Sequence, residues 1–433
     1  MRRILKIILI ALVTVAAWTT YELIRNNAVE MRPARPDNRM FNLAVDGVLV
    51  AIEEGRAYDS AVLKDASAYV GQRYDCSDFR LQSMARILYA HRDSIGDEDY
   101  ELIKHTFLDF KYWMDQPGSD SMCYWSENHQ LLFAASEFLA GQYWPDEIFT
   151  NAWMTGRQHQ ALARERILTW LELRWLYGFT EWYSNTYYVE DIAPLANLID
   201  FAEDEEIVIK AKMVLDLLLY DLASQSYRGT FISSSGRMYA NGKRYPEKNG
   251  MQAVIDHIWN PVRWGREPSE RIGMDQNFIR MRNYDVPPVI KAIGEDDGRE
   301  LVIRASTGLN LDELEAEGLL GLENRQIMMQ WAMESFSNPE VITNTMDYMN
   351  KTDMFPNEFL HDLNDFNLAI LRYTGAMPQI SKSLNPVTNG TAIQRANTYT
   401  FRTPDYMVAS AQAYHPGTFG DQQHVWNATL SRD

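Results

Sequence analysis

The 433-residue chain contains only two cysteines, Cys76 and Cys123, and neither belongs to a Cys-x-x-Cys pair. It also has no His-Glu-x-x-His motif and no glycine-rich phosphate-binding loop. These absences argue against a structural zinc site, a zinc-peptidase helix and a nucleotide-binding loop. In an oxidising compartment the two cysteines could pair, but their spacing alone does not decide the question.

Basic residues are scarce as well. The sequence has 41 Lys and Arg against 59 Asp and Glu, which gives a formal net charge of −18. This excess of negative charge argues against nucleic acid as a partner. It argues more weakly against an acidic polymer, because a local basic cleft could override the global field.

Apolar and aromatic residues are plentiful. Hydrophobic residues make up 46% of the chain and aromatic residues 12%, so the sequence can build a large core. The aromatic enrichment fits an enzyme that stacks on sugar rings and also a large helical core, and it favours carbohydrate only mildly.

The N-terminus has the pattern of an export signal. A basic flank at residues 1–6 precedes an apolar stretch at 7–18, and Val15-Ala16-Ala17 offers a small-residue cleavage site. The apolar stretch is short for a membrane span, yet an uncleaved anchor stays open. We therefore predict a signal peptide or signal anchor over 1–27 and a proline-containing linker over 28–40. The body of the protein is expected to be periplasmic, extracellular or anchored facing outside.

A helical period dominates from residue 41 to about 375. The apolar spacing predicts helices near 41–55, 79–93, 98–114, 127–142, 157–177 and 205–225, and less clearly near 251–258, 286–293, 311–318, 325–334 and 358–374. So many helices without a fixed repeat predict a mainly α fold, an antiparallel (α/α) toroid over 41–380.

The pattern changes to alternation in the last segment, 381–433. Residues 397–403, 406–411 and 424–430 read as strands. Two or three strands make a poor sheet alone, so this segment is predicted to be the N-terminal part of a β-sandwich-like domain that is incomplete here. The alternative is that these strands pair only with one another against the helices.

The richest polar stretch precedes the apolar run 131–139. Ser126 is a good N-cap, which places Glu127, Asn128 and His129 in the first turn of a helix. The partial positive charge of that helix end predicts a neutral His129 able to accept a proton. The alternative is a helix cap with a hydrogen-bonded structural histidine.

A second segment, 177–191, is an aromatic loop between two long helices. Tyr187 and Tyr188 are candidate proton donors or acceptors, and Glu181 and Asp191 are candidate carboxylates. The alternative is an aromatic loop that only packs on the helices, with Asp191 capping the next one.

A third segment, 227–245, is the one basic stretch in an acidic chain. Arg228 and Arg237 could hold a carboxylate, although a solvated hairpin turning at Asn241-Gly242 is the simpler interpretation. Near the C-terminus, His424 could overhang a cleft or be structural.

These stretches, a helix-initial Asn-His pair, a tyrosine-rich loop and helices followed by strands, resemble the polysaccharide lyases of the alginate lyase, chondroitin AC lyase and heparinase II/III type. The resemblance implies an (α/α) toroid with a β-domain over 41–433. It assigns Asn128 to neutralising a uronate carboxylate, His129 to the base, and Tyr187 or Tyr188 to the acid or base. Arg228 or Arg237 would hold the carboxylate. This chain reads Glu-Asn-His where alginate lyases carry Asn-Asn-His.

The sequence therefore predicts an exported enzyme that cleaves a uronic-acid-containing polysaccharide by β-elimination, without a metal or other cofactor. Its predicted catalytic residues are Asn128, His129, Tyr187, Tyr188, Glu127 and Glu181, and its predicted substrate-binding residues are Trp125, Trp182, Arg228, Arg237 and His424. An inverting glycoside hydrolase using two of Glu127, Glu181 and Asp191 is the main alternative. A non-catalytic glycan-binding surface protein is the other.

Overall fold

The computed structural model describes residues 2–384, 392–414 and 422–430. It is mainly helical, with 54% helix and 9% strand, and it carries a small antiparallel sheet built largely from the C-terminal segment. This confirms the predicted fold class at that level. The predicted C-terminal residues 385–391, 415–421 and 431–433 lie outside the described part of the chain.

The helices that carry the fold differ widely in length. They are α1 (Arg2–Asn27), α2 (Val45–Glu53), α3 (Ser60–Gly71), α4 (Ser77–His91), α5 (Asp97–Leu108), α6 (Glu127–Tyr143), α7 (Gly156–Tyr177), α8 (Tyr188–Phe201), α9 (Glu205–Gln225), α10 (Ala240–Arg244), α11 (Gln252–Ile258), α12 (Asp275–Ile279), α13 (Pro288–Glu295), α14 (Asn324–Ala332), α15 (Ile342–Thr352), α16 (Ala369–Thr374) and α17 (Met377–Ser383).

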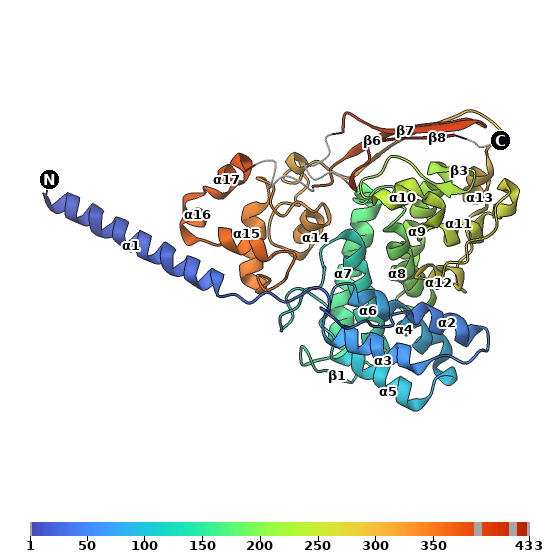
Figure 1. Cartoon of the computed structure of the whole chain (residues 1–433), viewed down its shortest axis with the longest axis horizontal. Coiled ribbons are helices and arrows are strands. Elements are labelled where there is room, and N and C mark those ends of the chain that lie inside the picture. The colour runs from blue at the N-terminus through green and yellow to red at the C-terminus, as the bar shows by residue number, and fades with distance from the viewer. Residues whose placement is uncertain (1, 385–391, 415–421, 431–433) are drawn as a thin grey trace.

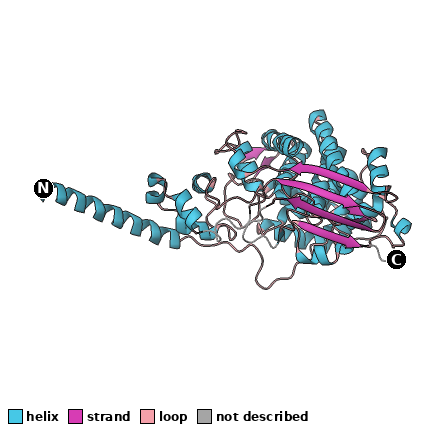
Figure 2. Ribbon diagram, turned by 90° about the horizontal axis from the view of Figure 1, so that it is seen from above, coloured by secondary structure: helices cyan, strands magenta, loops and turns pink. Residues whose placement is uncertain are grey.

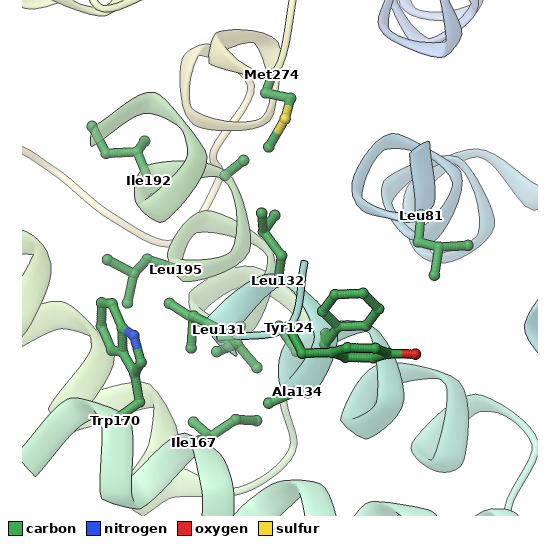
Figure 3. Close-up of a cluster of buried hydrophobic side chains, with 14 of the residues drawn as sticks. Leu81, Tyr124, Leu131, Leu132, Ala134, Ile167, Trp170, Ile192, Leu195 and Met274 are labelled. Atoms are coloured by element: carbon green, nitrogen blue, oxygen red, sulfur yellow. The ribbon is translucent and has the colours of Figure 1, made fainter. Parts of the chain in front are cut away.

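α6 lies at the centre of the helical body because it is apolar around most of its circumference. Every residue of it from Glu127 to Gly141 is buried. It packs against α4, α7, α8 and α14. Figure 3 shows its Leu131, Leu132 and Ala134 surrounded by labelled side chains of α4, α7 and α8.

The antiparallel pair α6–α7 is held close by glycine. A Cβ on Gly141 would overlap the backbone oxygen of Gly156, and one on Gly156 would overlap that of Trp144. α7 starts with a capping box between Thr155 and Gln158, which satisfies backbone groups at its N-terminus. The sequence thus fixes both the start of α7 and its close approach to α6.

The other helices pair in two series. α2, α4, α6, α8 and α12 contact one another in that order, and a second series of contacts joins α3 to α5, α7 to α9 and α9 to α13. Figure 1 shows these helices stacked together, with α14 to α17 lying between them and α1.

The larger sheet has four antiparallel strands in the order β5 (Leu301–Thr307), β6 (Ala396–Arg402), β7 (Tyr406–Gln412) and β8 (Trp426–Leu430). Figure 2 shows it lying across the helices. The strands expected at the C-terminus pair with one another, and β5 joins them from the helical part of the chain. Two two-stranded hairpins, β1–β2 (Ile148–Phe149, Met154–Thr155) and β3–β4 (Ser226–Tyr227, Thr230–Phe231), complete the described strands.

One face of the sheet is buried against helix ends. Thr398, Thr400 and Arg402 alternate with more exposed residues along β6. The Arg402 guanidinium donates to backbone oxygens of Ala223 and Ser226 beside the end of α9, and to those of Ile293 and Asp296 at the end of α13. This contact with the negative ends of two helices docks the sheet.

One local prediction and one alternative interpretation are wrong. Residues 311–318 form only the short 3-10 helix η4 (Leu311–Glu313), which begins with a capping box between Asn310 and Glu313. Asn241-Gly242 does not turn a hairpin but lies inside α10, where the Asn185 amide donates to the Gly242 oxygen. The first difference arises from local side-chain bonds of the capping box, whereas the second involves a bond from Asn185, far along the chain.

α1 is long and apolar enough to cross a membrane by length and composition. Most of its length is exposed, and Figure 1 shows it projecting from the rest. Its last turns are docked, since the Asn26 amide donates to the oxygens of Asn364 and Asn367 at 3.0 and 2.9 Å. Glu22 accepts the backbone N–H of Ala369 at 3.0 Å.

Candidate active site

The side chain of Glu127, the first residue of α6, is buried in the protein interior. It has no solvent exposure and forms an ion pair with Arg174 of α7, which is also buried. The backbone N–H and the hydroxyl of Thr180 donate to the same carboxylate at 2.6 and 2.5 Å. These contacts join α6, α7 and the aromatic loop, and they give Glu127 a structural place rather than a substrate contact.

Asn128 is buried in a polar network. Its side-chain oxygen accepts from the Ser126 hydroxyl at 2.5 Å, and its amide donates to Glu190 of α8. Ser126 stands at the N-cap position as predicted, but its hydroxyl serves Asn128 instead of a backbone N–H. In this structure the Asn128 amide therefore bonds to the carboxyl group of Glu190.

His129 is held by Asp78. Its Nδ1 lies 2.7 Å from Asp78 Oδ2, and its ring stacks on Phe79 with centroids 5.1 Å apart. Burial disfavours the imidazolium, but the charge and hydrogen bond of Asp78, aided by the two cysteines, raise the pKa of His129 well above its ordinary value. The prediction of a neutral His129 is wrong, because the helix end is outweighed by this carboxylate.

Glu181 and Arg237 form the next part of the network. Arg237 Nη1 lies 2.5 Å from Glu181 and 2.9 Å from Glu334, and its guanidinium covers the Tyr187 ring at 4.1 Å. The Tyr187 hydroxyl donates to Tyr239 at 2.7 Å. Burial raises the pKa of Tyr187 despite the opposing charge of Arg237, so the phenol is not activated as a base.

The remaining aromatic candidates lie in the core. Tyr188 is fully buried, its hydroxyl donates to Asp221 at 3.0 Å, and burial raises its pKa well above the ordinary value. Trp182 has no exposure, and Trp125 is 5% exposed and packs edge-on against Trp331. Buried rings cannot stack on a sugar, so stacking by Trp125 and Trp182 finds no support here.

Arg228 and His424 lie elsewhere. Arg228 Nη2 donates to the Pro404 oxygen at 3.1 Å at the edge of the C-terminal sheet. The backbone of His424 pairs with Ser235, and its Nε2 lies 2.9 Å from the Met238 oxygen. Asp191 is fully buried in the first turn of α8. The structure thus unites Asn128, His129, Glu181, Arg237 and Tyr187 in one buried region, and it leaves Arg228 outside that region.

An open hollow of about 520 Å³ adjoins this region. Phe79, which stacks on His129, and Glu190, which accepts from Asn128, are in its wall. The beginnings of α2 and α12 supply two further carboxylates, Asp46 and Asp275. The other polar walls include the guanidinium groups of Arg80 and Arg271.

Burial shifts all three carboxyl groups of the hollow toward the neutral form. It raises the pKa of Glu190 to about 8, with Glu181 adding to the shift and His129 opposing it. It raises the pKa of Asp275 to about 6, where nearby Asp46 adds to the effect. The pKa of Asp46 is also raised by burial, against a hydrogen bond from the Ser83 hydroxyl at 2.5 Å. Carboxyl groups with separated pKa values facing one hollow are suited to acid and base catalysis.

Sequence reasoning missed these three carboxylates. Glu190 closes the aromatic segment beside Asp191, so its position was a usable signal. Asp46 and Asp275 stand at ordinary helix starts, where an acidic residue is expected for capping reasons alone. Only the packing of α2, α8 and α12 brings them to one cavity.

One group of side chains has the composition of a metal site. Within the described residues, ligand atoms of Asp75, Cys76 and His129 all lie within 4.8 Å of one another. Both Cys76 and Cys123 are free thiols. Burial raises the pKa of Cys76 to about 12 and that of Cys123 to about 11.

Comparison of the chain with protein-family models, with curated proteins and with solved structures finds no match.

Proposed function

We propose that this protein is a carbohydrate-active enzyme that cleaves a glycosidic bond in the hollow by inverting hydrolysis. The observation that carries the proposal is the set of three carboxyl groups, Asp46, Glu190 and Asp275, on the wall of one open cavity of about 520 Å³. Inverting hydrolases need one protonated and one ionised carboxyl group with room between them for water.

The different pKa values of Glu190 and Asp275 indicate which group acts as the acid and which as the base. With a pKa of about 8, Glu190 is protonated at neutral pH and acts as the general acid. Asp275, with a pKa of about 6, is ionised and acts as the general base. Water attacks the anomeric carbon and gives its proton to Asp275, while the proton of Glu190 goes to the departing glycosidic oxygen. The Asn128 amide, which donates to Glu190, fixes the acid in place.

The experiment is product analysis on a panel of neutral and acidic polysaccharides. We expect new reducing ends of inverted anomeric configuration, without ultraviolet absorbance. Glu190→Gln and Asp275→Asn should each lower kcat by about 10²–10⁴-fold. Asp146→Asn, at an exposed ion pair with Arg157, is the matched control and should keep full activity. Full activity in both hollow variants would exclude the proposal.

Polyuronate lyase activity is the second candidate, and one observation favours it. Arg80 and Arg271 line the same hollow as Glu190, and a guanidinium pair suits a uronate carboxylate. The base would remove the C5 proton and the C4 oxygen would leave, which creates a double bond that absorbs in the ultraviolet. Absorbing products that disappear in Arg80→Met would favour elimination over hydrolysis. Glycan affinity without any product would favour the binding-only function.

We also propose that the helices form an (α/α) toroid. The contact series α2–α4–α6–α8–α12 supports an inner layer, and the contacts among α3, α5, α7, α9 and α13 support an outer one. The first turns of α2, α6, α8 and α12 contribute Asp46, Asn128, Glu190 and Asp275, so this layering explains why the candidate groups gather at one rim.

We also propose that the protein is exported and stays attached to a membrane. The length and apolar composition of α1 support it, together with the basic residues that precede the apolar stretch. Fractionation of cells should place the full chain in the membrane fraction, with the helical body accessible to protease from outside. Protection of that body in intact cells would contradict this localisation.

A further inference from the structure

Three potential metal ligands from two separate segments of the sequence meet behind the wall of the hollow. Asp75 and Cys76 stand at the start of α4, and His129 lies in the first turn of α6. Their ligand atoms are mutually within 4.8 Å, and Asp75 and His129 are 9% and 6% exposed. A thiol, an imidazole and a carboxylate are donors that zinc accepts together in proteins.

The imidazole is oriented as it is in many metal sites. His129 Nδ1 lies 2.7 Å from the fully buried carboxylate of Asp78, which leaves Nε2 for another partner. The Cys76 thiol donates to Asp75 Oδ2 at 3.5 Å. Metal-bound histidines commonly give their second ring N–H to a carboxylate, which fixes the tautomer and the ring orientation.

The backbone at Cys76 positions its side chain. Its φ is 60°, in the left-handed region that non-glycine residues rarely adopt. Such a conformation is strained and persists where the surroundings require it. Here it turns the chain at the N-cap of α4, where the Cys76 side chain meets His129 and Asp75.

Cys123 supplies the candidate for a fourth ligand. Its backbone N–H donates to Asp75 Oδ1 at 3.3 Å, which links the segment before α6 to the same carboxylate. Its thiol lies 3.7 Å from the Ser126 hydroxyl and is not among the three ligand atoms that lie within 4.8 Å of one another. Cys123 is therefore held beside the cluster by its backbone, and its thiol would turn toward the ion to become a ligand.

We propose that Asp75, Cys76 and His129, with Cys123 as the fourth ligand, bind a zinc-class divalent cation that fastens the start of α4 to the start of α6. Thiolate and imidazole donors select zinc over magnesium or calcium, which prefer oxygen ligands. Two thiol protons and the Nε2 proton of the His129 imidazolium leave when the ion binds, and no electron transfer is involved. The site is structural in this proposal, since four protein ligands leave no open position.

The test uses the full chain in detergent, reduced and stripped of metal, and titrates it with Zn²⁺ against a chromophoric chelator. We expect one equivalent to bind. Co²⁺ in its place should give the ligand-field and sulfur charge-transfer absorption of a tetrahedral thiolate site. Cys76→Ser and His129→Gln should weaken binding by at least about 100-fold, and Asp78→Asn by about 10–100-fold.

His105→Gln, on the exposed side of α5, is the control and should bind as the unaltered chain does. Cys123→Ser should remove one sulfur ligand from the cobalt spectrum, and an unchanged spectrum would refute its place in the site. Should Cys76→Ser not fold, the cobalt spectrum of the unaltered chain still decides whether sulfur binds metal.

Two results would overturn the proposal. One is the absence of Zn²⁺ binding, or equal binding by the Cys76 and His129 variants. The other is a Cys76–Cys123 disulfide in protein isolated without reductant, because paired sulfurs cannot ligate. Glycan cleavage is a separate readout, since Glu190 and Asp275 are not ligands. Chelation should lower the melting temperature while the folded fraction keeps its cleavage activity.

Discussion

Glu127 and Arg174 form a buried ion pair whose two side chains are 0% and 1% exposed. Breaking such a pair leaves an uncompensated charge in the core, which costs about 3–5 kcal/mol. We therefore expect Arg174→Met to lower the free energy of unfolding by this amount in urea titrations. Adding Glu127→Gln should recover part of the loss, because the orphaned charge is then removed.

The exposed pair of Arg157 with Asp146 is the matched control for that measurement. Its side chains are 67% and 81% exposed, so Arg157→Met should change stability little. Equal losses from Arg157→Met and Arg174→Met would show that the buried pair has no special weight.

Glu190 links the candidate chemistry to a pH-dependent stability. Its pKa rises from 4.5 to about 8 on folding, mainly through burial, so the folded chain holds a proton that the unfolded chain releases. The stabilisation is complete below pH 4.5 and is lost as pH rises toward 8. Glu190→Gln should flatten the decline of unfolding free energy between these two pH values.

The control for this pH series is Glu101→Gln on the exposed side of α5, which should keep the decline of the unaltered chain. Chemical denaturation at several pH values measures both variants. A decline of the same steepness in Glu190→Gln would assign the proton to another group.

Side chains of β6 attach the C-terminal sheet to helix ends, and Thr400 contributes through a hydrogen bond to Gln225 at the end of α9. Arg402 of β6 donates to four backbone oxygens beside α9 and α13. Hydrogen bonds that involve a charged group contribute about 1.5–3 kcal/mol, so Arg402→Met should destabilise the chain by at least about 2 kcal/mol. Arg304→Met on the exposed face of β5 removes a contact with the Tyr399 ring and should cost less than half as much.

Thermal unfolding followed by the signal of the sheet checks the comparison. A larger loss from Arg304→Met than from Arg402→Met would mean that the outer face of the sheet, not its contact with the helix ends, secures it.

The junction of α1 with the helical body offers another element-level test. Asn26→Ala removes a buried donor to the backbone oxygens of Asn364 and Asn367, of which the Asn364 oxygen still accepts the N–H of Asn367. We expect local opening to become easier by about 1–3 kcal/mol, seen as faster hydrogen exchange in η5 (His361–Phe366) and α16.

Thr20→Ala lies on the same helix but is exposed, and its hydroxyl bonds only within α1. It is therefore the control and should leave exchange in η5 and α16 unchanged. Unaltered exchange in both variants would mean that α1 does not stabilise this region.

The elements that could be predicted from the sequence are those whose signal is local. α6, α7 and α9 begin and end close to their expected limits, because a long apolar period acts within the segment itself and side chains cap the first turns of α7 and α9. β5 was not predicted, since its partner β6 lies far along the chain and only that pairing makes 301–307 a strand. The same reason explains the site. Asn128 and His129 are adjacent in the sequence and could be recognised as a pair, whereas Asp46, Glu190 and Asp275 meet only through tertiary packing.

The net charge of the whole molecule should affect the binding of acidic and neutral substrates differently. A net charge of −18 repels a polyuronate over a distance set by the ionic strength, about 30 Å at 0.01 M and about 8 Å at 0.15 M. A neutral glycan does not feel this field. If the substrate is neutral, kcat/KM should stay constant across this range of salt.

For an acidic glycan the same measurement should show kcat/KM rising with salt, because screening removes the repulsion that slows association. Arg271→Gln separates the local effect from the global one, since this exposed cation lines the hollow itself. With an acidic substrate the variant should raise KM most at low salt, where the local attraction is least screened. With a neutral substrate the variant and the unaltered chain should show the same flat salt profile, and a salt-dependent kcat/KM on a neutral glycan would contradict the assignment of the field to substrate charge.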